Sequence, residues 1–323
     1  MKKLISLILS CLMVLSLLAG CGSDPKADGT CKIAIVQQMD HPSLDQIRTA
    51  IEAQLKLLGE ESGCTVECQL FNGQNDPTML NQIGSQIVSG GYDAIIPIAT
   101  LAAQCMVTAA DGTGIPVIFS AISDPAEAGI TDLPQVTGIS DTLDTETILD
   151  ILLSLQPDVK TVGLLYSNSE PNSAAPIAQA KVYLEEKGIA CLEKTGNTTD
   201  EIVNAANALV GRVDAVFTPT DNVVMGAATA VEEIFKEAKL PHYTGADSFV
   251  EAGAFATCGV DYVELGTQTA DLAMKVLENG EVPAIQVMKG NIILVNDGTA
   301  KAIGLDYQTL FRMEDVVLET IAH

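Results

Sequence analysis

Carboxylate and hydroxyl side chains gather in short segments that are expected to connect a strand to the helix after it. Glu170, Asp221 and Asp247 stand in such segments in the second half of the chain, and Thr100 and Ser123 in the first half. A carboxylate accepts hydrogen bonds from an ammonium group, whereas hydroxyl and backbone N–H groups donate to a carboxylate. These residue types therefore predict a site for a small zwitterion such as an amino acid.

All the candidate ligand-binding residues share this position between a strand and a helix. They are Gln37, Thr100, Ala121, Ser123, Tyr166, Ser167, Glu170, Asn172, Asp221, Asn222 and Asp247. Thr100 precedes an expected helix, so its hydroxyl and the unpaired N–H groups of the first turn are suited to a ligand carboxylate. For each Ser, Thr, Asp or Asn an alternative stays open, in which the side chain only caps the following helix.

Residues that catalysis usually needs are sparse. The chain has three histidines, and neither Gly-x-Ser-x-Gly nor a Gly-x-Gly-x-x-Gly after the first strand is present. We expect His41 to be a loop or capping residue, not a ligand contact. Glu170 with Asp221 is the one conceivable acid–base pair, and without a sugar-binding context it does not indicate an enzyme. We expect no catalysis and no cofactor.

The cysteines do not form the framework of a small disulfide-rich domain, because they are scattered along a long chain. Cys64 and Cys68 have a spacing compatible with a metal pair, but residues 64–71 alternate like a strand and no second pair of Cys or His lies nearby. We therefore expect buried thiols and no metal site.

Apolar, β-branched runs alternate with segments of helical periodicity, which is typical of parallel βαβ units. The expected strands include residues 33–36, 94–98, 117–119, 162–165 and 215–217. The expected helices cover residues 44–58, 78–89, 101–110, 145–155, 174–187, 201–210 and 223–238.

The order of short motifs in the first half is repeated in the second half. Asp93-Ala-Ile-Ile96 returns as Asp214-Ala-Val-Phe217, Gly114-Ile-Pro-Val117 returns loosely as Lys239-Leu-Pro-His242, and residues 32–36 have a counterpart at 160–165. This order predicts an α/β protein of two Rossmann-like lobes with parallel sheets joined by a hinge. Open parallel sheets bind ligands beyond the carboxyl ends of their strands, so the cleft between the lobes is the expected site.

The N-terminus has the pattern of a lipoprotein signal peptide. Lys2 and Lys3 precede an apolar run from 4 to 18, and Leu18-Ala-Gly-Cys21 is a small-residue cleavage site. Residues 1–20 are expected to be removed, Cys21 to carry fatty-acyl chains such as palmitate, and residues 21–30 to form a tether on the outer face of the cell membrane. The alternative is an uncleaved membrane helix, although the apolar run is short for one.

The charge of the chain excludes some partners. Seventeen Lys and Arg stand against 42 Asp and Glu, giving a formal net charge of −25. Such a field repels nucleic acid, and no helix-turn-helix segment precedes Ile33, so a transcription factor is excluded. The hydrophobic content of 47% indicates a globular protein.

Several motifs along the chain together resemble one family, the substrate-binding lipoproteins of ABC transporters, in the group that includes tryptophan- and tyrosine-binding receptors. The motifs are Ile35-Val-Gln-Gln-Met-Asp-His-Pro-Ser-Leu-Asp45, Asn72-Gly-Gln-Asn-Asp-Pro77, Ile98-Ala-Thr100, Phe119-Ser-Ala-Ile-Ser-Asp-Pro125, Thr137-Gly-Ile-Ser-Asp141, Glu170-Pro-Asn-Ser173, Pro219-Thr-Asp-Asn222 and Gly259-Val-Asp-Tyr262. Gln135 departs from the family pattern, which often has Asn there.

The resemblance implies a type I periplasmic-binding fold with three crossovers between the lobes. The first lobe is then expected to hold residues 31–141 and about 259–284, and the second 142–258 and about 285–323. It also implies an apolar or aromatic amino-acid ligand, and a permease and an ATPase as partners of a monomeric receptor. Tyr166 and Phe119 lie beside cleft loops and are candidates for stacking on a ligand ring, with core packing as the favoured role for Phe119. A receptor that signals to a membrane sensor kinase stays open as the alternative.

Overall fold

The structure is a computed structural model that describes residues 29–290, 292–312 and 317–322. The expected signal peptide, Cys21 and most of the tether lie outside these residues. Within the described part of the chain, no helix combines the length and the apolar character that a bilayer span requires.

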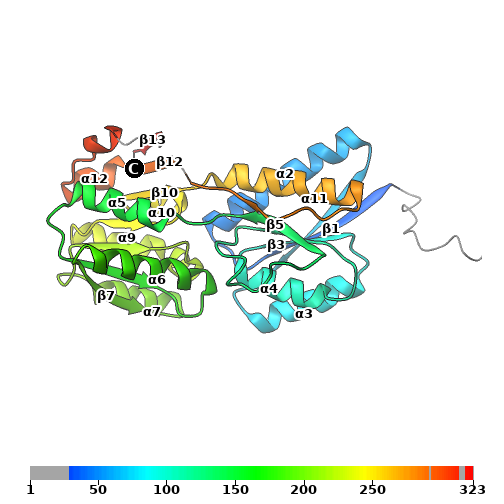
Figure 1. The fold of residues 1–323 in the computed structure, drawn as a ribbon, viewed down its shortest axis with the longest axis horizontal. Helices are drawn as coiled ribbons and strands as arrows, with labels where there is room; N and C mark the ends of the chain where they lie inside the picture. Colours follow the sequence, from blue (N-terminus) through cyan, green and yellow to red (C-terminus); the bar gives the residue numbers. More distant parts are fainter. Residues whose placement is uncertain (1–28, 291, 313–316, 323) are drawn as a thin grey trace, which may run out of the picture.

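Two α/β lobes lie side by side (Figure 1). The sheet of the first lobe has the order β11-β5-β4-β3-β1-β2. Its strands are β1 (Thr30–Gln37), β2 (Thr65–Asn72), β3 (Ala94–Ile98), β4 (Val117–Ser120), β5 (Val136–Ser140) and β11 (Gln286–Val287). Its helices are α2 (Pro42–Ser62), α3 (Pro77–Ser89), α4 (Thr100–Ala110) and α11 (Tyr262–Asn279), with α2 packed along α11. All strand pairs of this sheet are parallel.

The sheet of the second lobe has the order β13-β12-β10-β9-β8-β6-β7. Its strands are β6 (Thr161–Tyr166), β7 (Ala190–Thr195), β8 (Ala215–Thr218), β9 (His242–Thr244), β10 (Ala256–Gly259), β12 (Ile292–Asn296) and β13 (Val317–Ile321). Its helices are α5 (Thr145–Leu155), α6 (Pro171–Glu186), α7 (Thr199–Asn207), α8 (Asn222–Gly226), α9 (Ala228–Glu237), α10 (Asp247–Glu251), α12 (Asp297–Ile303) and the 3-10 turn η1 (Gln308–Arg312). One pair, β10 with β12, is antiparallel.

The chain passes between the lobes after β5, after β10 and after β11 (Figure 1). β11 pairs with β5 at residues 286 and 287, so the segment that returns to the first lobe extends slightly past the expected residue 284. The predicted fold class, two α/β lobes with largely parallel sheets, is confirmed.

The repeated motifs occupy equivalent places in the two lobes. Asp93 precedes β3, and its carboxylate accepts a hydrogen bond of 2.8 Å from the backbone N–H of Lys32. Asp214 precedes β8, and its carboxylate accepts one of 2.9 Å from the N–H of Lys160. Each Asp thus fixes the start of the first strand of its lobe against the third. The Asp recurs because, in both lobes, two neighbouring parallel strands have to start in register.

Two local features differ from expectation. The helix expected over 223–238 is interrupted at Ala227, next to Gly226, a residue with low helix propensity.

Cys68 is exposed on the edge strand β2, and Cys64 is half-buried, so the prediction of buried thiols is wrong for this pair. An edge strand of an open sheet presents one face to solvent, which the alternation alone did not reveal.

Candidate functional site

A cavity lies between the lobes, where the strands of both sheets end. The cavity has an empty volume of about 360 Å³, which includes space open to solvent. The lining residues are His41, Ser43, Leu44, Ala99, Ala121, Ser123, Asp141, Asn172, Thr220, Asp221, Asn222, Met225, Ala246, Phe249 and Tyr262. Both lobes contribute to this wall, so the cavity depends on how the lobes are placed.

Two alanines of the first lobe line the cavity in an unusual backbone conformation. Ala99 follows β3 with φ 76°, and Ala121 follows β4 with φ 58°. Positive φ is costly for a residue with a Cβ, and such strain gathers at functional sites. Here the turns are held by the sheet, because the N–H groups of Ala99 and Ala121 donate to Ser120 and Ile139. The chain therefore bends sharply at the cavity and starts α4 directly behind it.

The start of α4 offers groups that suit an anion. Thr100 is buried, and within the described part of the chain its Oγ1 has no hydrogen-bond partner. Its side chain therefore does not cap α4, which begins at Thr100 itself. One first-turn N–H is used, because Leu101 donates to Gln38 Oε1 at 3.0 Å. The remaining first-turn N–H groups lack an acceptor within the helix.

Asp141 is the carboxylate of the first crossover and lies in the cavity wall. Its Oδ1 is 3.3 Å from Ser123 Oγ and its Oδ2 is 3.4 Å from the hydroxyl of Tyr262. Burial raises the pKa of Asp141 to about 7, although these hydrogen bonds and one from the backbone oppose the shift. A buried carboxylate with two long hydrogen bonds retains the capacity to accept from a ligand ammonium group.

Asp221 lines the same cavity but is fully engaged by its own lobe. Its carboxylate accepts hydrogen bonds from Val224 N at 2.9 Å, from Ser167 N at 2.7 Å and from Ser173 Oγ at 2.6 Å. Asp221 therefore caps α8 and holds the turns after β6, as the helix-cap alternative states. Among the carboxylates of the wall, Asp141 is thus the freer acceptor.

A chain of hydrogen bonds crosses from lobe to lobe beside the cavity. Gln38 Nε2 donates to Glu170 Oε1 at 2.9 Å, and Asn222 Nδ2 donates to Glu170 Oε2 at 2.5 Å. His41 Nε2 lies 2.9 Å from Asn222 Oδ1 and closes the chain. Burial and the nearby Asp221 raise the pKa of Glu170 to about 8, whereas burial lowers the pKa of His41. We call these four residues, Gln38, His41, Glu170 and Asn222, the interlobe bridge.

Apolar side chains complete the wall. Leu44 of α2 belongs to the first lobe, and Met225, Ala246 and Phe249 belong to the second. Among the described residues that line the cavity, none is Lys or Arg, whereas Asp141 and Asp221 are carboxylates. The wall therefore combines a negative field with an apolar surface, which suits a cationic group attached to an apolar body.

The structure brings five of the predicted residues to the cavity, namely Ala121, Ser123, Asn172, Asp221 and Asn222. Glu170 and Ser167 stand directly behind it, bonded to lining residues. Thr100 follows the lining residue Ala99 in the chain. Asp247 is not a lining residue; it is largely buried at the start of α10, and its pKa is raised to about 7 by burial and by Glu251, Asp261 and Glu319.

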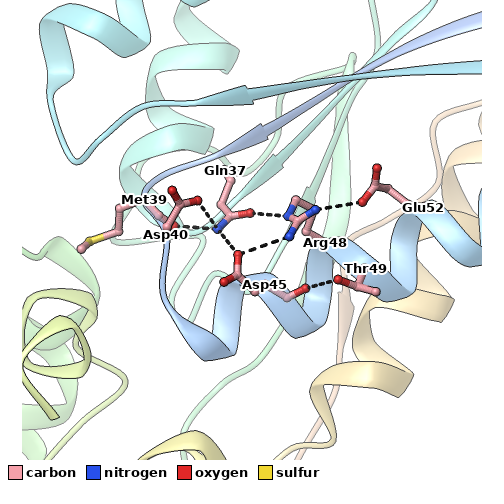
Figure 2. Close-up of polar contacts among 7 residues, drawn as sticks. All are labelled: Gln37, Met39, Asp40, Asp45, Arg48, Thr49 and Glu52. Atoms are coloured by element: carbon pink, nitrogen blue, oxygen red, sulfur yellow. Dashed lines mark hydrogen bonds and ion pairs between the residues drawn. The ribbon is translucent and has the colours of Figure 1, made fainter. Parts of the chain in front are cut away.

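Gln37 and Tyr166 are not among the lining residues. Figure 2 shows Gln37 turned toward the first turns of α2, where its Nε2 donates to Asp45 at 2.9 Å and its Oε1 accepts from Arg48 at 3.0 Å. The hydroxyl of Tyr166 donates to Glu193 at 2.8 Å on the outside of the second lobe. Phe119 is buried in the core of the first lobe, which agrees with core packing as its favoured role.

Several lining residues were not predicted from the sequence. Asp141 and Tyr262 stand at two different crossovers, and Phe249 stands in a short helix that the periodicity did not reveal. His41 was expected to be a loop or capping residue; it is the N-cap residue of α2, its side chain makes no cap bond, and it also lies in the wall. The signal for Asp141 and Tyr262 was present in the family motifs ending at these two residues.

Comparison with known proteins agrees with this geometry. The family described as ABC transporter substrate binding protein matches residues 32–314. The chain belongs to this family. It is therefore a substrate-binding protein of an ABC transporter, not an enzyme. A tyrosine-binding protein of Clostridioides difficile (strain R20291) is 31% identical over 96% of this chain and 94% of that protein.

Two solved structures bear on the lobe arrangement of this substrate-binding protein. A domain from Streptococcus pneumoniae in complex with L-Trp is 28% identical, covers 90% of this chain and all of its own, and superposes with a TM-score of 0.83. A ligand-free, open substrate-binding protein from Clostridium difficile is 31% identical, covers 90% of this chain and 99% of its own, and gives 0.65. The lobes here are thus placed more as in the ligand-bound protein, in accord with the interlobe bridge.

Proposed function

We propose that this substrate-binding protein captures an amino acid with an aromatic or apolar side chain in the cleft and presents it to the permease of an ABC importer. The observation that carries the proposal is the buried carboxylate of Asp141 in a cavity wall that includes the apolar side chains of Leu44, Met225 and Phe249 and, among the described lining residues, no Lys or Arg. The relatives named for tyrosine and bound to L-Trp support the same ligand class.

In this proposal each part of the wall binds one part of the ligand. Asp141 accepts from the ammonium group, and the start of α4 with the Thr100 hydroxyl donates to the carboxylate. Leu44, Met225 and Phe249 surround the side chain, with Phe249 in the stacking place for which Tyr166 was a candidate. Because these groups come from both lobes, a ligand that contacts them all stabilises the closed arrangement over the open one.

A panel of ligands tests the proposal. We expect tyrosine, tryptophan or phenylalanine, at about 100 times its Kd, to stabilise the protein by about 2.7 kcal/mol and raise its Tm by several degrees. Sugars, nucleosides and acidic amino acids should leave the Tm unchanged. Thermal unfolding followed by calorimetry measures the effect, and the absence of a shift with every aromatic and apolar amino acid would refute the ligand class.

We further propose that the protein acts as a monomer on the outer face of the cell membrane, held by lipid on Cys21. Exchanging Cys21 for Ala should release the protein from the membrane fraction while leaving its ligand affinity unchanged, since two acyl chains supply the anchoring free energy. Fractionation of cells followed by calorimetry on the released protein measures both. Continued membrane association of the Cys21→Ala protein would indicate an uncleaved membrane helix instead.

A further inference from the structure

Cys31 and Cys64 meet at the end of the first sheet where the described chain begins. Cys31 is the second residue of β1, and Cys64 directly precedes β2. The two strands are parallel, with Thr30 opposite Thr65 and Cys31 opposite Val66. The sulfur atoms lie 3.0 Å apart, and both side chains are half-buried. Neither thiol belongs to the cleft or to the proposed ligand chemistry.

The observation that favours a disulfide is the short distance between the two sulfur atoms. Cys31 is opposite Val66, so Cys64 lies two residues away from it along the neighbouring strand, and the two side chains reach toward each other diagonally. A sulfur–sulfur bond is about 2.0 Å long, so the two sulfur atoms must approach by about 1 Å. The strand ends are fixed independently of the thiols, because Thr65 N donates to Gly29 O at 2.9 Å. Oxidation therefore requires rotation of the two side chains and loss of the hydrogen bond from Cys64 Sγ to Gly29 O, while the backbone bond from Thr65 to Gly29 can be kept.

We propose that Cys31 and Cys64 form a disulfide bond when the protein meets an organic disulfide oxidant outside the cytoplasm. The thiolate of one cysteine attacks the oxidant, forms a mixed disulfide and releases one thiol of the oxidant. The thiolate of the other cysteine then attacks the cysteine sulfur of the mixed disulfide and releases the second thiol. The protons of the two cysteines end on the two released thiols, and the oxidant takes up the two electrons.

The position of this bond gives it a role in attachment. β2 is an edge strand of the sheet, and β1 begins at the outer end of the first lobe, away from the second lobe (Figure 1). The bond closes a loop that contains α2, whose first residues border the cleft. A pull on residues before Cys31 then acts on both strands instead of β1 alone. The unfolded chain is also restricted by the closed loop, which stabilises the folded state.

Thiol trapping on the full-length protein tests the proposal. The protein, purified in detergent, is treated with oxidised glutathione, its remaining thiols are alkylated under denaturing conditions, and its peptides are identified by mass. We expect the Cys31 and Cys64 peptides to be joined, with a mass two hydrogens below their sum, and to escape alkylation. Reduction should lower the Tm by about 5 °C.

Three variants sharpen the test. Cys31→Ser and Cys64→Ser should lose both the joined peptide and the effect of reduction on Tm. Cys68→Ser, on the same strand and exposed, should keep both. Complete alkylation of Cys31 and Cys64 in the oxidised protein, a stable glutathione adduct on either residue, or a bond from either residue to Cys68 would each overturn the proposal. Thiol trapping on the unaltered protein tests the bond between Cys31 and Cys64 even if a variant fails to fold.

Discussion

Asp141→Asn should weaken the binding of an aromatic amino acid by at least about 30-fold, which corresponds to about 2 kcal/mol. The amide keeps the shape of the side chain and its place between Ser123 and Tyr262, but it removes the negative charge that faces the ligand ammonium group. Removing one member of a buried charge pair typically costs 2–5 kcal/mol of binding, so the estimate is at the lower end.

The same substitution should not destabilise the empty protein. Burial raises the pKa of Asp141 to about 7, so the ionised side chain is disfavoured in the folded state. The contribution of Asp141 to the free energy of unfolding therefore becomes less favourable as the pH rises from about 4 to about 7. At pH 8 the Asn protein should therefore have an equal or higher Tm. Lower affinity without lower stability distinguishes a ligand contact from a structural residue.

Titration calorimetry measures the ligand affinity of the Asp141→Asn protein. Two controls test whether the lost charge is the cause of the weaker binding. Asp158→Asn, a change of the same kind at an exposed position of the second lobe, should leave affinity unchanged. A ligand analogue that lacks the amino group should bind the original and the Asn protein about equally well. If Asp141→Asn weakened this analogue as strongly as the amino acid, Asp141 would not be the ammonium acceptor.

Closure of the empty protein should depend on pH through Glu170. In the closed arrangement the pKa of Glu170 is raised from 4.5 to about 8, mainly by burial and also by Asp221. Opening the cleft hydrates the carboxyl group and lets its pKa fall, so closing takes up a proton at intermediate pH. The closed-to-open ratio should therefore fall by at least about tenfold as the pH rises from 6 to 8, since each pKa unit is a factor of ten.

Glu170→Gln should remove most of this pH dependence, because the amide stays neutral and still reaches Gln38 and Asn222. Small-angle X-ray scattering of the empty protein from pH 5 to pH 9 measures the change as an increase in the radius of gyration.

Glu186→Gln at the opposite end of α6 makes the same exchange on the surface and should behave as the original protein. An unchanged radius of gyration across this range in the original protein would contradict the role of Glu170. A response that survives in Glu170→Gln would assign it to the neighbouring Asp221, whose pKa burial also raises.

Much of the fold followed from local patterns. The helix expected over residues 145–155 has these bounds in the structure, and the expected runs at 94–98 and 215–217 form β3 and β8. Long periodic helices and buried β-branched strands carry strong local signals. The two-residue strand β11 was not predicted, because so short an element owes its form to its neighbours.

The site was predicted in its general position but not in its individual contacts. Loops after parallel strands were expected to line the cleft, and the structure places Ser123 and Asn172 in the cavity wall. Whether a loop side chain turns inward depends on its other partners. The side chain of Gln37 bonds to Arg48, and that of Tyr166 bonds to Glu193. The sequence does not show either of these partners.

The sequence by itself determined two repeated α/β lobes, a strongly acidic chain, and polar loops at the strand ends, since each of these depends on residue type and short-range spacing. Only the tertiary structure decided that Asp141, Tyr262 and Phe249 line one cavity, that Asp221 bonds to Ser167 and Ser173, and that Cys31 lies against Cys64. Those relations join residues from separate crossovers and strands. Their distances are set by how the two sheets pack and face each other, which no local pattern contains.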